Sequence, residues 1–349
     1  MAKSKETRTR DEPGGYIEKL NHLSPRDANG MLVLDLFAGC GGLALGFEAA
    51  GFRTLGYEAN KDCCATYNAN LEGRCVTEFL TRDSEFPSAR IVVGGPPCQP
   101  FSVNGNQKGV DDPRNGFPAF LAAIRKTTPD LFMLENVRGL LYRNRWYLDE
   151  IVAEFERLDY LVDCQLLNAV HYGVPQNRER VIIVGHRGGY RFPARVNQTV
   201  TAGEALGELA AKAPPESKFL TPGMDKYIAN YEKASKCVTP RDLHLDRPAR
   251  TLTCRNLAGA TGDMHRVRLP DGRRRRLSVR EAARLQSFPD WFVFHGGADS
   301  AFTQIGNAVP PLFGYHLAKS VSEYFENKER ETRPAAGKTS AKDRQPSLS

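Results

Sequence analysis

Short apolar runs separated by helical patterns occupy the first half of the chain. The runs predict buried strands at residues 31–37, 52–57, 91–93, 131–134 and 181–184. Between them, the pattern predicts a helix that ends near Ala50 with Gly51 as its cap, and a second helix over Phe117–Lys126. An apolar stripe over residues 148–158 predicts a third helix. Because strands that alternate with helices are joined by crossovers, the chain is expected to form a parallel α/β sheet.

The pattern changes after about residue 187. Residues 187–277 are rich in proline and have few long periodic stretches, which indicates a second, smaller domain. Helical patterning returns at Ser278–Gln286, where Ser278 and Glu281 fit a capping box, and again at Pro311–Phe325. We expect a main domain of residues 30–186 and 303–326, a hinge at 278–302, a flexible arm at 1–29 and a disordered tail at 327–349.

Charge adds a hint about the partner of this protein. The net charge is +7, which is compatible either with solubility alone or with a polyanionic partner such as nucleic acid. The distribution favours the second interpretation, since many arginines fall in one short segment. They are Arg266, Arg268, Arg273, Arg274, Arg275, Arg276, Arg280 and Arg284.

Other features of the composition narrow the class of protein. No C-x-x-C pair occurs among the eight cysteines, so we expect no zinc site. No apolar run has the length of a membrane span, and the polar residues 1–15 do not resemble a secretory signal. We therefore expect a cytoplasmic protein without disulfides, in which most cysteines are small buried residues.

The first candidate motif is the glycine-rich turn in residues 35–42, between a predicted strand and a predicted helix. Gly39, Gly41 and Ala44 satisfy the loose pattern G-x-G-x-x-A, which lets a ligand approach the backbone at the carboxyl edge of a sheet. Glu58 ends the next predicted strand, where an acid can hold ribose hydroxyl groups. The pattern favours an adenosine-type cofactor without specifying which one.

Three further motifs place reactive side chains beside predicted strands. In residues 95–102 the prolines fix the backbone around Cys98, which favours a positioned nucleophile over a packing residue. Glu135 follows a buried strand, where a carboxyl group is costly unless it is paired or used in proton transfer. In residues 176–180, Gln176, Arg178 and Arg180 alternate and would share one face of an extended segment. Two arginines on one face could bind phosphates, stack on a base or pair with Glu135.

With the segments at 280–289 and 304–311, these motifs resemble, in this order, those of the cytosine-C5 DNA methyltransferases of restriction-modification systems. The resemblance covers residues 31–326. It implies a Rossmann-like sheet that binds S-adenosylmethionine, with residues 187–277 as the target-recognition domain. One position departs from the family: Cys75 stands where an acid usually contacts the adenine amino group. Glu78, Asp83 or the backbone near Val76 is expected to take over this contact.

The resemblance also implies roles for individual residues. Cys98 would add to C6 of a flipped-out cytosine, Glu135 would hydrogen-bond the base, and residues 104–112 would close over it. The implied catalytic residues are Cys98, Glu135, Arg178 and Arg180. The implied cofactor contacts are Phe37, Ala38, Gly39, Gly41, Glu58, Pro97, Phe117 and Asn307, without a metal. The implied DNA contacts are Gln99, Ser102, Gln176, Arg273, Arg274, Arg275 and Arg276.

Three other functions compete with this interpretation. A dehydrogenase would explain the glycine turn but leaves Cys98 and Glu135 without a role. A tRNA cytosine-C5 methyltransferase would carry the same catalytic motifs, and the arginine-rich segment favours double-stranded DNA over it. A catalytically inactive DNA-binding regulator is disfavoured by the intact Cys98, Glu135 and Arg178. We expect a monomer that protects host DNA from a cognate endonuclease, and the sequence does not reveal which bases it recognises.

Overall fold

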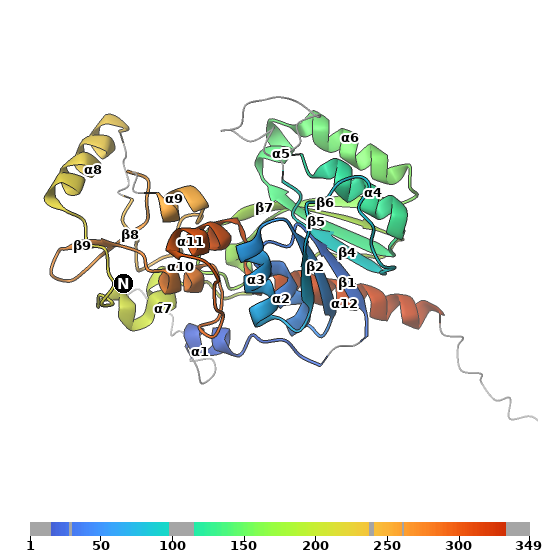
Figure 1. Ribbon diagram of the computed structural model, residues 1–349, viewed down its shortest axis with the longest axis horizontal. Helices are drawn as coiled ribbons and strands as arrows, with labels where there is room; N and C mark the ends of the chain where they lie inside the picture. Colours follow the sequence, from blue (N-terminus) through green and yellow to red (C-terminus); the bar gives the residue numbers. More distant parts are fainter. Residues whose placement is uncertain (1–14, 28–29, 98–114, 237–240, 260–261, 333–349) are drawn as a thin grey trace, which may run out of the picture.

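The computed structural model describes residues 15–27, 30–97, 115–236, 241–259 and 262–332. Within these ranges, a seven-stranded sheet with the order β3-β2-β1-β4-β5-β7-β6 organises the larger domain (Figure 1). The strands are β1 (Leu32–Leu36), β2 (Arg53–Glu58), β3 (Arg74–Thr77), β4 (Ile91–Gly94), β5 (Leu131–Val137), β6 (Leu161–Asn168) and β7 (Glu179–His186). Each predicted strand is therefore present, within a few residues of its expected bounds.

The last two strands differ from the expected parallel arrangement. β1 to β5 pair in parallel, whereas β7 runs antiparallel to both β5 and β6. Only residues 169–178 connect β6 to β7, and a parallel crossover needs about a dozen residues or more. β6 was not predicted because most of its side chains are at least partly exposed, which leaves no apolar run.

Helices cover both faces of the sheet. On one face lie α2 (Gly42–Ala49) and α12 (Pro311–Thr332), which bury Phe47 and Phe313 against Val33 and its neighbours. A methyl group on Gly46 would overlap the backbone of Gly314, so glycine permits these two helices to cross closely. The other face carries α4 (Phe117–Thr127), α5 (Gly139–Tyr142) and α6 (Arg145–Glu156), and α3 (Lys61–Asn70) packs near β2 and β3.

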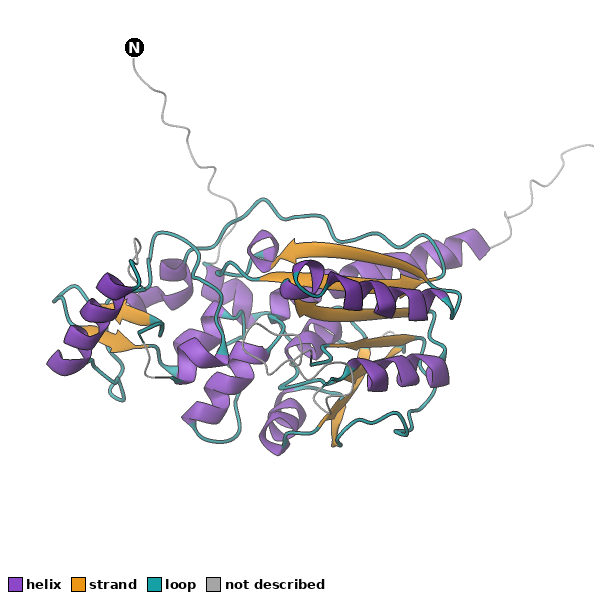
Figure 2. Cartoon of the chain, turned by 90° about the horizontal axis from the view of Figure 1, so that it is seen from above, coloured by secondary structure: helices purple, strands orange, loops and turns teal. Residues whose placement is uncertain are grey.

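The second domain lies at one end of the sheet domain (Figure 2). It contains α7 (Ala202–Leu206), α8 (Pro222–Ala234), α9 (Cys254–Ala258), β8 (Arg266–Arg268) and β9 (Arg274–Arg276). The expected hinge at 278–302 contains α10 (Val279–Leu285) and the first half of α11 (Ala298–Asn307), which continues past the expected boundary. α10 begins with the predicted capping box, in which Ser278 accepts a hydrogen bond from the Glu281 N–H. One apolar cluster includes Leu206 from the second domain, Leu285 from α10 and Ala44 from α2, so this region packs as a junction.

Both ends of the chain differ from expectation where the structure describes them. Residues 16–21 of the expected flexible arm form helix α1 (Tyr16–Asn21). Leu20 in α1 is buried, and the Tyr16 hydroxyl donates a hydrogen bond of 2.9 Å to the Arg284 carbonyl. α12 continues beyond the expected limit at 326 to Thr332. The sequence did not indicate this extension, because the last turns are polar and lack an apolar stripe. No helix in the described ranges is both long enough and apolar enough to cross a membrane.

Candidate active site and DNA cleft

The glycine-rich turn lies at the carboxyl edge of β1 and brings the first two strands together. Phe37, Gly39 and Gly41 have φ angles of 60°, 55° and 88°, and Gly41 is the N-cap of α2. The Gly39 N–H donates to Glu58 Oε2 at 2.9 Å, and the Asn60 N–H donates to Glu58 Oε1 at 2.8 Å. Both carboxylate oxygens of Glu58 keep further acceptor capacity, which suits them to ligand hydroxyl groups.

Other expected cofactor contacts surround the same edge. A methyl group on Gly116 would meet Pro97 and Phe37 together, so these two side chains lie beside the start of α4, where Phe117 is buried. Ala38 belongs to the turn itself, and its N–H donates to the Tyr57 carbonyl at 3.1 Å. Asn307 is exposed at the end of α11, directly before Ala308 and Val309, which a methyl group on Gly42 of the same turn would meet.

Asp35 is the buried acid of this edge. Its side chain is 1% exposed, and Oδ2 has no hydrogen-bond partner among the described residues. Burial, and secondarily the charge of Glu58, raises the pKa of Asp35 well above its usual range. An unsatisfied polar atom beside a glycine turn fits a site that is completed by a bound ligand.

The position that departs from the family is also buried. Cys75 is 3% exposed, and burial raises the pKa of its thiol far above the ordinary value. Its N–H donates to Asn68 Oδ1 at 2.7 Å. Of the two acids suggested as substitutes, Glu78 lies at the edge itself, because its N–H donates to the Glu58 carbonyl at 3.0 Å. Asp83 lies farther along the loop and is exposed.

Glu135 and Arg180 form an ion pair across the antiparallel strands β5 and β7. Arg180 Nε lies 2.6 Å from Glu135 Oε1, and the two side chains are only 12% and 13% exposed. A methyl group on Gly95 would lie 3.6 Å from Glu135 Oε2, and Asn136 Nδ2 donates to the Pro96 carbonyl at 3.0 Å. The acid is therefore held beside the turn at Gly95–Pro97.

Cys98, Gln99, Ser102 and the loop at 104–112 lie outside the described residues. The described flanks of this segment are joined, because the Gly116 N–H donates to the Pro97 carbonyl at 3.0 Å. Asn115 also donates to the Tyr147 hydroxyl at 2.7 Å. The residue directly before Cys98 is thus fixed against α4, close to the turn that Glu135 contacts.

Gln176 and Arg178 face the domain junction and do not share a face with Arg180, because β7 begins only at Glu179. Arg178 is 1% exposed and donates to the carbonyls of Leu252, Gly306 and Ala308 at 2.8, 3.2 and 2.9 Å. Burial lowers its pKa. This placement corrects the expected contact with the base and gives Arg178 a structural role.

Gln176 is fully buried and also holds the junction. Its amide nitrogen donates to the Leu285 carbonyl at 2.9 Å, and its oxygen accepts from the Leu252 N–H at 3.0 Å. It has no exposed surface for DNA, which corrects that expectation. Both junction residues bind the backbone of Leu252, so this residue of the second domain anchors the junction.

The arginine run corrects another expectation. Arg275 is fully buried, and two of its nitrogens lie 2.7 Å from the two oxygens of Glu281. Arg274 pairs with Asp225 at 2.5 Å, and Arg276 donates to the carbonyls at the end of α9. Arg273 is 63% exposed and pairs with Asp271 at 2.7 Å. Only Arg273 therefore presents its guanidinium mainly to solvent.

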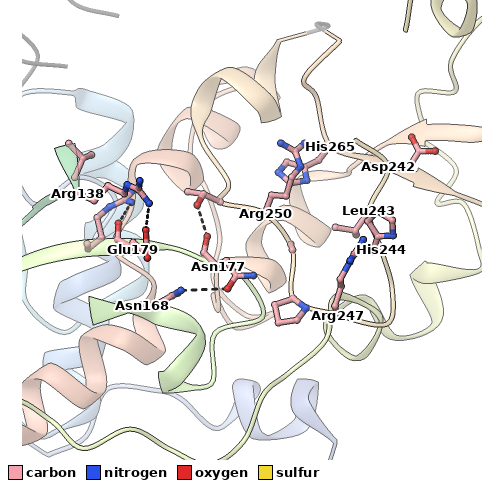
Figure 3. A pocket seen from close by; sticks show the side chains of 15 residues that line it. Arg138, Asn168, Asn177, Glu179, Asp242, Leu243, His244, Arg247, Arg250 and His265 are labelled. Atoms are coloured by element: carbon pink, nitrogen blue, oxygen red, sulfur yellow. Dashed lines mark hydrogen bonds and ion pairs between the residues drawn. The ribbon is translucent and has the colours of Figure 1, made fainter. Parts of the chain in front are cut away.

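A cavity of about 630 Å³ separates the two domains beside the Glu135–Arg180 pair (Figure 3). The sheet domain contributes Arg138, Asn168, Asn177, Glu179 and Arg180, and the second domain contributes His244, Arg247, Arg250, Thr251 and His265 among others. The Asn177 N–H donates to the Ala249 carbonyl at 2.8 Å, so the two walls are directly connected. Apart from Arg180, sequence reasoning had not singled out any of these residues as a site.

The fold and the site define a class of protein. A sheet in which strand β7 runs antiparallel between β5 and β6, with a glycine turn and an acid at its carboxyl edge, has the Rossmann-like architecture of S-adenosylmethionine-dependent methyltransferases. Among the described residues, no cluster of His, Cys, Asp or Glu could hold a metal ion.

Comparison with known proteins identifies the family. The family described as C-5 cytosine-specific DNA methylase matches residues 31–237 and 227–323. The chain is 56% identical to Type II methyltransferase M.AplI of Arthrospira platensis over 90% of this chain and 92% of that protein. It is 34% identical to Type II methyltransferase M1.HphI of Haemophilus parahaemolyticus over 85% and 88% of the two chains.

Solved structures agree in fold. A putative DNA modification methyltransferase from an E. coli prophage superposes with a TM-score of 0.64 at 23% identity, over 85% of this chain and 100% of that one. DNMT2 of Spodoptera frugiperda gives 0.65 at 17% identity, over 84% and 100%. The chain belongs to the C-5 cytosine-specific DNA methylase family and is a DNA (cytosine-5-)-methyltransferase of the restriction-modification type.

Proposed function

We propose that this protein transfers a methyl group from S-adenosylmethionine to C5 of a cytosine within a specific double-stranded DNA sequence, and thereby protects host DNA from a cognate endonuclease. The position of Glu135 carries the proposal. This carboxylate is paired with Arg180 and lies beside the turn that leads directly into Cys98. The relatives named Type II methyltransferases support the protective role.

The carboxyl edge of β1 and β2 would hold the cofactor. Glu58 would accept hydrogen bonds from the ribose, the turn at Gly39–Gly41 would pass close to the ligand, and Phe37 would pack against the adenine. Glu78 or the backbone near Val76 would replace the missing acid of the adenine contact. When bound, S-adenosylmethionine supplies an electrophilic methyl group on a sulfonium sulfur.

The chain itself would supply the activation of cytosine. C5 of cytosine alone is a poor nucleophile and needs activation. The Cys98 thiolate would supply it by adding to C6, which places electron density on C5. Glu135 would hydrogen-bond N3 and the exocyclic amine, while Arg180 fixes the direction of the carboxylate. After methylation, loss of the C5 proton would expel the thiolate of Cys98.

The interdomain cavity supports extrusion of the base. A cytosine inside a duplex is stacked and inaccessible to Cys98, so the base must rotate out at a cost of about a few kcal/mol. The cavity adjoins Arg180 on its sheet-domain wall, next to the ion pair with Glu135. A base that enters from DNA in this cleft would therefore reach the acid and the Gly95–Pro97 turn together.

Substitution of the nucleophile tests the proposal. Cys98→Ala should abolish methyl transfer and leave the melting temperature and cofactor binding unchanged, because only the covalent step is lost. DNA that contains 5-fluorocytosine should trap the wild type covalently, since fluorine cannot leave as a proton. Cys164→Ala, at an exposed cysteine of β6, is the matched control and should keep full activity.

Two outcomes would overturn the proposal. Methylation by the Cys98→Ala protein at a rate near that of the wild type would exclude this cysteine as the nucleophile. Methylation of tRNA but not of DNA by the wild type would assign a different substrate. Bisulfite sequencing of DNA treated with the purified protein measures the first outcome directly, and the same assay reveals the modified sequence.

A further inference from the structure

The arginines of the interdomain cavity differ in whether their guanidinium groups are paired with a carboxylate. Four arginines line it: Arg138, Arg180, Arg247 and Arg250. Arg138 pairs with Glu179 at 2.6 Å, Arg180 with Glu135 at 2.6 Å and Arg250 with Asp263 at 3.2 Å. Within the described part of the chain, the guanidinium of Arg247 has neither a carboxylate nor a hydrogen-bond partner, and the residue is exposed. Its donors are therefore available to a ligand in the cleft.

The backbone around Arg247 is held on both sides. Its carbonyl accepts a hydrogen bond of 2.9 Å from the Ala202 N–H at the start of α7. Two residues later, Ala249 forms a parallel bridge with Gln176, and its N–H donates to the Pro175 carbonyl at 2.9 Å. Pro248 between them restricts the chain further. A side chain on such a fixed segment suits the reading of a base edge, which requires defined geometry.

Two histidines on the same wall also have unused polar atoms. His265 is 3% exposed, and neither ring nitrogen forms a hydrogen bond with a described residue, although the Thr251 carbonyl lies nearby. The Nε2 atom of His244 is likewise buried without a partner. Figure 3 shows Arg247 and His244 together on the wall opposite Arg138 and Glu179. Unsatisfied donors and acceptors on one wall indicate that a polar ligand completes it.

We propose that Arg247 determines part of the recognition sequence by donating two hydrogen bonds to a guanine. A planar guanidinium matches O6 and N7 of guanine in the major groove, and this is the commonest specific contact between a side chain and a base. The proposal rests on the proposed function, because it requires DNA in the interdomain cavity. Arg247 lies on the segment bonded to Pro175–Asn177, so the guanine should be close to the target cytosine.

The first experiment compares sequence preference in a randomised DNA library by bisulfite sequencing. Arg247→Ala should still methylate cytosine, and its preference for guanine at one position should fall by about one to two orders of magnitude. Arg247→Lys should lose most of the same preference, because it keeps the charge without the planar fork. Arg268→Ala removes an exposed arginine of β8 that does not line the cavity, and should leave the preference unchanged.

The second experiment uses binding alone, so it remains informative even if the alanine variant no longer methylates DNA. Each guanine of the wild-type recognition sequence is replaced in turn by 7-deazaguanine, which lacks the N7 acceptor. At one position the wild type should lose affinity by about tenfold, and Arg247→Ala should show no further loss there. This coupling identifies the contacted atom.

The two proposals fail differently. If the wild type does not methylate DNA, the proposed function fails. If it does, and Arg247→Ala keeps the same sequence preference while binding all DNA more weakly, then Arg247 contacts a phosphate and the inference is overturned. In that case the salt dependence of binding should also become shallower, by a slope of about 0.9 for one lost phosphate contact.

Discussion

The arginine run at 273–276 gives a sharp test of what its residues do. Arg275→Met would remove a fully buried guanidinium that contacts both oxygens of Glu281, whose side chain is also fully buried. It would also leave the carbonyls of Leu209 and Lys212 without their donor. Removing one partner of a buried ion pair costs about 3–5 kcal/mol, because the other charge remains without compensation. Each kcal/mol lowers the melting temperature of a domain of 150–250 residues by about 2–4 °C, so we expect a drop of about 6–20 °C.

The assay is thermal unfolding followed by circular dichroism, with urea unfolding as a second measurement. Arg275→Met/Glu281→Gln should recover part of the loss, because glutamine removes the buried charge and can still accept hydrogen bonds at Ser278. Arg273→Gln is the matched control: its ion pair with Asp271 is solvent-exposed, so the change should stay within about 0.5 kcal/mol.

One result would refute this reasoning. If Arg275→Met unfolded at the wild-type temperature but bound DNA more weakly and with a shallower salt dependence, Arg275 would contact phosphate. The side chain would then have to leave its pair with Glu281 when DNA binds, and its burial in the free protein would not describe its function.

Two further predictions concern the cofactor and pH. Glu58→Ala should weaken S-adenosylmethionine binding by about 1–3 kcal/mol in calorimetry, since a charged acceptor is lost; unchanged affinity would make Glu58 purely structural. Burial lowers the pKa of His265 to about 4, so the folded state favours the neutral ring. The free energy of unfolding therefore keeps its full value above about pH 6.5, and it decreases by about 3 kcal/mol as the pH falls towards 4, where the unfolded state binds a proton that the folded state does not. His265→Gln should flatten the dependence in urea unfolding; an unaltered slope would contradict the assignment.

Much of the fold was predictable because its signals are local. Apolar runs mark β1, β4, β5 and the second half of β7, since strands covered by helices on both faces bury most of their residues. The strand β6 gave no such signal, because it lies at the sheet edge and exposes much of its surface. The antiparallel direction of β7 follows from its short connection to β6, which sequence patterns cannot show until β6 is recognised.

The candidate site also contains residues that could be placed from the sequence and residues that could not. Gly39, Glu58 and Glu135 lie at or near the ends of strands, where neighbouring residues predict a role for each, and the structure brings Gly39 and Glu58 into contact. Arg178 could not be placed from its surroundings in sequence, because its three carbonyl acceptors lie 74 to 130 residues away. The cavity wall at Arg247 escaped notice for the same reason, since it is defined by contacts between two domains.

The arginine-rich segment shows why charge density along a sequence is a poor guide to DNA contacts. Arg266 is fully buried between Glu232 and Asp242, and Arg284 is held by Asp290. These guanidinium groups are held inside the protein, where each pairs with a carboxylate or a carbonyl. A charge that is neutralised inside the protein adds little to the field at the DNA surface. The arginines that act on DNA are therefore to be sought among those left unpaired beside the cleft, as Arg247 is.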